Sequence, residues 1–467
     1  VEVLSCVSGG SIIGAHYYLE VKKLLETAPD EQITPQAYID LVARIERDFL
    51  DAVQRNIRMR VAGNPWFSLK MAFQRGFSRT ERLGQLLDSS LYSRTGPRQS
   101  LDDLCIQPVG AQQDFSPSRD NWRRAAKVPI LILNATTLNT GHVWQFTPSW
   151  MGESSHAITT EIDSNDLLRR VYYDRAPTRH RHIPLGRAVA ASACVPGLFD
   201  PIELDKLYPN RTVRLVDGGI HDNQGIAGLL EQDCAVMLVS DASGQMHSER
   251  QPSAHVRGAL GRMNSILMAR VREAEYRELN ARRRSMLLRG LMYIHLRRDL
   301  VTETVNWIGC VEPFEPTDDA EIASHGPLTS YGVFTDVQER LAAIRTDLDS
   351  FNDCEAYTLM YSGYKMTGQA YAPGVPTLPP AAGQASWRFL SLQPSIDKAR
   401  GKEEAYDALL TILTVARHRL FKVGRFGGFG AAAWALLLVI LVVGVVEEWA
   451  VYASLSWTAV HAWLKPM

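Results

Sequence analysis

Two short stretches carry side chains that are able to act on a carbonyl group. The chain begins VEVLSCVSGGSIIG, in which Ser8 follows a short apolar run and precedes two glycines and a helical pattern. Far along the chain, LVDGGIHDNQG places Asp217 at the end of another apolar run, again before two glycines. A serine hydroxyl attacks a carbonyl carbon when a nearby group takes its proton. Ser8 is therefore a candidate nucleophile, and the alternative is a serine that only caps a helix.

The residues around Ser8 are those of a nucleophile elbow, a sharp turn between a strand and a helix. Such a turn strains the serine backbone and calls for small residues two positions before and after it. Gly10 meets this requirement, whereas Cys6 stands where glycine is usual. A helix that begins near Gly9 would direct its N–H groups and the positive end of its dipole at a developing oxyanion. We expect the Gly9 amide to be one oxyanion donor.

The loop after Asp217 has its own requirements. Gly218 and Gly219 would let the backbone bend sharply and leave space beside the carboxylate, although Asp-Gly pairs also form ordinary hairpin turns. We expect His221 to be a surface-loop residue. Asp222 and its neighbour Asn223 are expected to shape the loop by hydrogen bonds from side chain to backbone.

Alternating strand and helix patterns surround these two stretches. A nearly continuous apolar run such as VPILILNATTL is typical of a strand that is covered on both faces. The alternation predicts an α/β/α sandwich with a mostly parallel sheet. Strand patterns lie at residues 1–5, 128–138, 211–217, 234–242 and 290–296, and helical patterns at 35–60, 185–194 and 256–286.

Three ordered blocks together resemble the patatin-like phospholipases. They are the elbow around Ser8, the block AVAASACVPGLFDPIEL at residues 188–204, and DGGIHDN at residues 217–223. NATTLNTGHVWQF at residues 134–146 and RTDLDSF at residues 345–351 are also similar to that family. The resemblance covers residues 1–370, with an insert at about residues 63–122.

The resemblance implies a catalytic dyad in place of a triad. Ser8 would be the nucleophile and Asp217 the base, and the reaction would hydrolyse lipid esters through an acyl-enzyme without a cofactor or a metal. An aspartate of ordinary pKa is a poor base for serine, and desolvation in a lipid pocket would raise its pKa. The family also carries a glycine-rich oxyanion loop before the elbow strand. Since the sequence starts at Val1, we expect that loop to lie in a missing N-terminal region.

A second feature of the chain is an apolar segment close to its end. Residues 426–446, FGGFGAAAWALLLVILVVGVV, contain no charged residue. As a helix this segment would be about 31 Å long, close to the hydrocarbon thickness of a bilayer. Basic residues precede it and Glu447 and Glu448 follow it, which predicts a single-pass membrane protein with its large domain in the cytoplasm. A buried core helix is the alternative.

The remaining boundaries follow from composition. A proline-rich linker is predicted at residues 371–386, a juxtamembrane helical region at 387–425, and a short tail at 447–467. The net charge of −1 provides no basic field for nucleic acid. The six cysteines lie far apart, which argues against a zinc site and against a disulfide scaffold.

The predicted protein is a membrane-anchored serine hydrolase that cleaves carboxylic esters of phospholipids or lysophospholipids. The lipid is its expected substrate, and the bilayer is its expected partner through residues 426–446. Two alternatives remain at this point: a membrane scaffold that keeps the fold without turnover, and a serine esterase or peptidase that acts on other substrates. The arginine-rich pattern at residues 256–286 would be either a solvated helix face or a contact with anionic headgroups, of which the solvated face is favoured.

Overall fold

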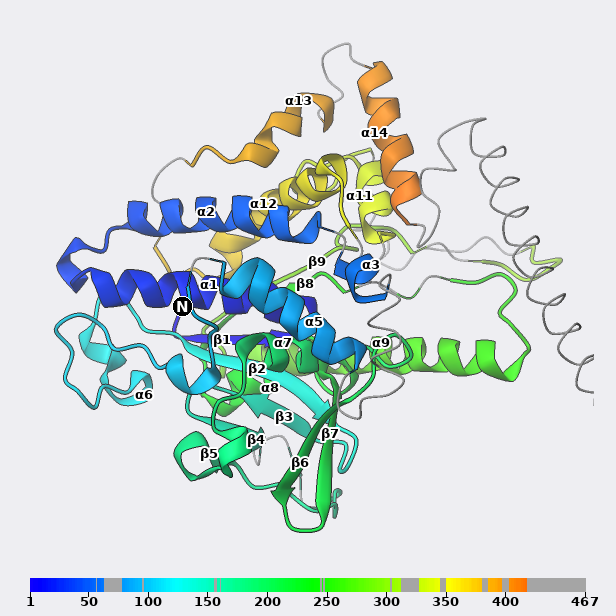
Figure 1. Cartoon of the computed structure of the whole chain (residues 1–467). Helices are drawn as coiled ribbons and strands as arrows, with labels where there is room; N and C mark the ends of the chain where they lie inside the picture. Colours follow the sequence, from blue (N-terminus) through cyan, green and yellow to red (C-terminus); the bar gives the residue numbers. More distant parts are fainter. Residues whose placement is uncertain are drawn as a thin grey trace, which may run out of the picture.

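The computed structural model places most of the chain up to residue 417 (Figure 1). It describes residues 1–55, 57–62, 78–94, 96–154, 158–159, 161–243, 246, 248–302, 305–311, 327–344, 350–379, 385–396 and 403–417.

A main sheet of seven strands occupies the first half of the described chain. Its strand order is β5-β4-β3-β2-β7-β6, with β1 paired to β2 beside that path. β1 and β2 are parallel, and every other neighbouring pair in the described sheet is antiparallel. The prediction of a mostly parallel sheet is therefore wrong. The strands are β1 (Val3–Val7), β2 (Ile130–Thr137), β3 (Val143–Phe146), β4 (Trp150–Glu153), β5 (Val171–Tyr172), β6 (Ile202–Tyr208) and β7 (Arg211–Asp217).

Short connections explain the antiparallel pairing. β3 and β4 are joined by residues 147–149, and β6 and β7 by residues 209–210. Parallel neighbours need a crossover of about a dozen residues or more, which these loops cannot supply. The prediction relied on alternation with helices, but here strand follows strand directly.

Parallel pairing of the expected kind is found in a separate sheet. β8 (Val236–Asp241) pairs in parallel with β9 (Gly290–His295). The long helix α9 (Val256–Arg284) provides the crossover between them. The mixed α/β content that the sequence indicates is thus present, divided between two sheets.

Helices cover the main sheet and complete its core. Figure 1 shows α1 (Gly9–Thr27), α2 (Pro35–Val53) and α5 (Arg79–Leu87) above the sheet, and α7 (Leu185–Ser192) packs against α5. The described part of residues 63–122, which the sequence suggested as an insert, supplies several fully buried side chains to this core. They are Leu83, Leu86, Leu87, Leu101 and Leu104. Shorter helices nearby are α3 (Ile57–Ala62), α6 (Pro117–Asp120) and α8 (Ile226–Glu231).

The C-terminal part of the described chain forms a second apolar core with β9. α11 (Thr335–Ala342), α12 (Asp353–Gly374), α13 (Gln393–Ile396) and α14 (Glu403–Ala416) contribute to it. Helix α12 continues into the segment predicted as a linker from residue 371, and α13 and α14 lie in the predicted helical region 387–425. Within the described residues, no helix combines the length and apolar character that a membrane crossing requires. The predicted span at 426–446 and the tail at 447–467 lie outside them.

Candidate active site

Ser8 sits at the turn between β1 and α1. Its backbone has φ 51° and ψ −125°, a conformation that residues other than glycine rarely adopt. The Ser8 side chain occupies the N-cap position of α1 but accepts no capping hydrogen bond. The turn is therefore a strained elbow, and its hydroxyl is not engaged as a helix cap.

Strand β2 brings Asp217 to this elbow. β3 occupies one edge of β2, so β1 and β7 must share the other edge. On that shared edge Val7 is opposite Asn134, and Asp217 is opposite the next residue, Ala135. Since β1 is parallel and β7 antiparallel to β2, their carboxyl ends point toward each other. Ser8 and Asp217, at those two ends, come together.

Asp217 is almost completely buried. Its exposed fraction is 2%, and its Oδ1 accepts a hydrogen bond of 2.8 Å from the Gly219 N–H. Burial raises the pKa of Asp217 to about 6, while the hydrogen bonds from Gly219 and from the Ser8 side chain oppose that rise. Oδ2 nevertheless has no partner of ordinary hydrogen-bond geometry. We conclude that the hydroxyl is close to the carboxylate but not fully aligned with it.

The end of α7 braces both candidate residues. The Ser8 N–H donates to the carbonyl oxygen of Ser192 at 3.2 Å and to its Oγ at 3.0 Å. The Ser192 hydroxyl in turn donates to the Asn134 carbonyl at 2.6 Å. Two residues further on, the Cys194 carbonyl accepts the Asp217 N–H at 3.1 Å. Sequence reasoning did not assign Ser192 or Cys194 a role, although both lie in the block at residues 188–204.

The two glycines after Asp217 are required by close approach. A Cβ on Gly218 would lie 2.4 Å from the Asn134 carbonyl oxygen, in the seam between β2 and the loop. A Cβ on Gly219 would lie 2.5 Å from Asn223 Oδ1. Only glycine leaves room at both positions, so the short helical turn η8 (Gly218–Ile220) can begin directly after the aspartate.

The small residues of the elbow are arranged differently from the expectation. A Cβ on Gly9 or on Gly10 would meet nothing within 4 Å, so the strand and the helix do not crowd Gly10. The close approach is at Gly14, where a Cβ would lie 2.3 Å from the Cys6 sulfur. Cys6 is tolerated where glycine is usual because α1 presents a glycine to it.

The loop after the glycines is held by hydrogen bonds to Asp222. Asp222, which is 2% exposed, accepts backbone N–H bonds from Gln224, Ile226 and Ala227 and so holds the start of α8. This agrees with the loop-shaping role that the sequence indicates. His221 is partly buried rather than fully at the surface, and burial lowers its pKa.

A cavity of about 2600 Å³ opens beside the pair, and both Ser8 and Asp217 line it. Much of its lining is apolar, which suits an acyl chain. The apolar lining residues include Ile13, Phe49, Ile57, Leu91, Val195 and Phe199. The described residues contain no group of three or more His, Cys, Asp or Glu side chains placed to hold a metal ion.

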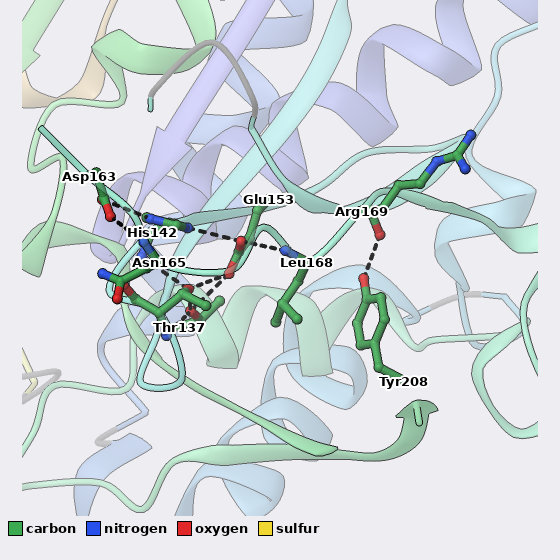
Figure 2. Close-up of polar contacts among 9 residues, drawn as sticks. Thr137, His142, Glu153, Asp163, Asn165, Leu168, Arg169 and Tyr208 are labelled. Carbon is green, nitrogen blue, oxygen red and sulfur yellow. Dashed lines mark hydrogen bonds and ion pairs between the residues drawn. The ribbon is translucent and has the colours of Figure 1, made fainter. Parts of the chain in front are cut away.

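A second polar cluster lies at the opposite edge of β2, where β3 and β4 are paired (Figure 2). Nδ1 of His142 lies 3.0 Å from a carboxylate oxygen of Glu153, and Nε2 lies 3.0 Å from a carboxylate oxygen of Asp163, so that each carboxylate can accept from the imidazole ring. Glu153 is 1% exposed and also accepts bonds from the hydroxyls of Thr137 and Thr140 and from the Leu168 N–H. Burial lowers the pKa of His142, but the two carboxylates raise it by more. The cluster was not apparent in the sequence, because its members come from separate loops and strands.

Comparison with known proteins bears on the first half of the chain. No curated protein matches the sequence. Residues 1–230, which contain the elbow, the bracing helix α7 and the loop after Asp217, match the sequence model of the family described as patatin-like phospholipase. Residues 1–230 therefore form a patatin-like phospholipase domain.

Proposed function

We propose that this protein hydrolyses carboxylic esters of phospholipids or lysophospholipids, with Ser8 as nucleophile and Asp217 as base. The membership of a lipid acyl hydrolase family supports the reaction class. The observation that carries the proposal is the convergence of two carboxyl strand ends, which puts a strained serine beside a buried aspartate in one apolar cavity.

The reaction requires one proton carrier. Ser8 Oγ attacks the ester carbonyl carbon while Asp217 takes the hydroxyl proton, and the carbonyl oxygen becomes an oxyanion. In this proposal the amide of Gly9, which begins α1 and has no partner within the helix, donates to that oxyanion. When the tetrahedral intermediate collapses, Asp217 returns the proton to the leaving alcohol and the acyl group stays on Ser8. Water, deprotonated by Asp217, then releases the fatty acid and restores the serine.

The pKa of Asp217 favours this role. A carboxylate with a pKa of about 6 is a stronger base than an ordinary aspartate, yet it is still ionised at neutral pH. The missing alignment at Oδ2 is compatible with a site whose hydrogen bonds tighten when substrate binds.

Substitution of the two residues tests the proposal. In the full-length protein, Ser8→Ala and Asp217→Asn should each lower fatty-acid release from lysophospholipid by at least about 10³-fold. The measurement is free fatty acid by mass spectrometry, with Ser285→Ala and Asp51→Asn as exposed controls that keep activity. Retained release in either site variant would disprove the dyad.

The same assay separates the two alternatives. A protein that folds but releases no acid from any ester is a scaffold. A protein that cleaves short soluble esters or peptides and leaves lipids intact is an esterase or a peptidase. Both results would overturn the lipid proposal.

We also propose that residues 426–446 anchor the protein in a membrane, with the hydrolase domain in the cytoplasm. The support is the run of 21 uncharged residues and the basic residues before it. Deletion of residues 426–467 should shift the protein from the alkaline-resistant membrane fraction to the soluble fraction. Added protease should degrade the domain only when the cytoplasmic side is accessible.

A further inference from the structure

One side of the first half of α9 is apolar and has no covering element among the described residues. Figure 1 shows the green helix α9 extending sideways out of the body. Its exposed large apolar side chains are Val256 at 74%, Leu260 at 54%, Met263 at 51%, Ile266 at 41% and Leu267 at 56%. Clustered apolar side chains of this size on a surface mark an interaction site.

The spacing of these residues defines one docking face. Val256, Leu260, Met263 and Leu267 recur at intervals of three and four, so they lie along the same side of the helix. The second half of α9 is held differently, because Leu279 is fully buried and packs with β8 and β9. The helix is thus fixed at one end and presents the docking face, residues 256–267, at the other.

The charge of this region selects the kind of partner. Residues 250–272 contain five arginines and no aspartate or glutamate. Arg262 contacts Glu249, Arg270 contacts Glu273 and Arg272 contacts Asp241, so those three charges are partly balanced from outside the segment. A second copy of the same face would bring the same positive charge against it. An anionic lipid surface offers both apolar depth and negative charge, as interfacial helices of this composition require.

Helix α9 also contributes to the lining of the cavity that contains the candidate catalytic pair. Asn264, Met268 and Arg272 line the same cavity as Ser8 and Asp217. We propose that the docking face of α9 binds an anionic lipid surface and holds the cavity opening against it. This deepens the proposed function and rests on it for its role, although the binding itself needs no turnover.

Hydrogen exchange on the full chain tests the binding. The Ser8→Ala protein is mixed with vesicles of phosphatidylcholine alone or with one third phosphatidylglycerol, so that no lipid is consumed. We expect amides of residues 256–267 to exchange at least about fivefold more slowly with the anionic vesicles than with the neutral ones. Because the readout is local, binding through residues 426–446 does not imitate it. Unchanged exchange on anionic vesicles would overturn the inference.

A matched pair of variants tests whether docking of α9 supports hydrolysis at a lipid surface. L260E/M263E/L267E places three charges on the docking face, and L138E/I162E/L167E places three on exposed apolar residues elsewhere. We expect the first variant to lose at least tenfold more activity on anionic vesicles than on a soluble short-chain ester, and the control to lose both equally. Equal losses in the first variant would contradict the inference.

The outcomes are distinguishable from failure of the proposed function. Protection of α9 without any lipid hydrolysis by the wild-type protein would refute the function and keep the docking. Lipid hydrolysis without protection of α9 would refute the docking and leave the proposed function standing. Protection that appears without vesicles and grows with protein concentration would identify a second copy as the occupant and overturn the lipid assignment.

Discussion

Gly14 of α1 lies directly against Cys6 of β1, so that a methyl group on Gly14 would be 2.3 Å from the Cys6 sulfur. The cysteine is buried, with an exposed fraction of 6%. The helix and the strand on either side of the elbow are therefore fitted to each other at this pair. The fit holds the strained turn at Ser8 from both sides.

This fit predicts a reciprocal rescue. Gly14→Ala should lower the free energy of unfolding by about 1–3 kcal/mol through overpacking. Addition of Cys6→Ala should recover most of that loss, because it removes the sulfur that the new methyl group meets. Urea unfolding of the two single variants and the double variant measures the coupling. Gly10→Ala, whose methyl group enters open space, is the control and should leave stability nearly unchanged; purely additive effects at Gly14 and Cys6 would contradict the fit.

The buried carboxylate predicts the pH dependence of activity. Asp217 must be ionised to take the Ser8 proton, and its pKa is about 6. Below that value kcat/KM should fall about tenfold per pH unit, and above it the rate should level off. Initial rates on a soluble ester between pH 4.5 and 8 test this, with circular dichroism to verify that the protein stays folded. A profile that is flat down to pH 4.5 would exclude Asp217 as the base.

The same burial predicts that the candidate base destabilises the fold. Because its folded pKa is raised, Asp217 contributes stability that is present at pH below about 4 and is lost as pH rises through about 6. Asp217→Asn keeps an acceptor for Gly219 and avoids the buried charge. We expect it to raise the free energy of unfolding at pH 7.5 by about 2–3 kcal/mol.

Thermal unfolding across pH measures this effect. The difference in Tm between Asp217→Asn and wild type should grow from pH 4.5 to pH 7.5. The exposed control Asp51→Asn should show no such trend. A difference that is constant with pH would mean that the Asp217 charge costs no stability.

The polar cluster around His142, at the β3 edge of β2, is expected to stabilise the fold in a pH-dependent way. Its carboxylates raise the pKa of His142, so the pairing stabilises the fold below pH of about 6.5 and loses its effect as pH rises through the raised pKa. Glu153→Gln should therefore destabilise the protein by about 3 kcal/mol at pH 6 and by less at pH 9. Urea unfolding at the two pH values tests it. Asp163→Asn, at a more exposed partner, should cost less at both pH values. An equal loss for Glu153→Gln at pH 6 and pH 9 would contradict the prediction, because it would mean that His142 does not change charge between them.

Local sequence was sufficient for the two turns that carry the candidate pair. The order strand, Ser8, two glycines and helix specifies a sharp turn within a few residues, and Asp217 followed by two glycines specifies another. Both are local because neighbouring backbone dihedrals and side-chain sizes determine them. The ordered blocks around these turns also carried the family resemblance that the match of residues 1–230 supports.

The direction of the strands required the tertiary structure. A strand pattern records burial on its faces but not which neighbour it pairs with. The short loops that join β3 to β4 and β6 to β7 made those two pairs antiparallel. How α1 packs against β1 also required the tertiary structure. The sequence indicated crowding at Gly10, whereas the close contact is between Cys6 and Gly14. The hydrogen bonds of Ser192 to Ser8 and of Cys194 to Asp217 also depend on the tertiary structure, because α7 must end beside β2 for them to form.

The sequence by itself thus determined the chemical groups and the local turns that present them, because these depend on residues close together in the chain. Only the tertiary structure decided that Ser8 and Asp217 meet, since both strands had to pair with the same edge of β2 from opposite ends. It also decided the basicity of Asp217, because a pKa depends on how much water the surrounding chain excludes.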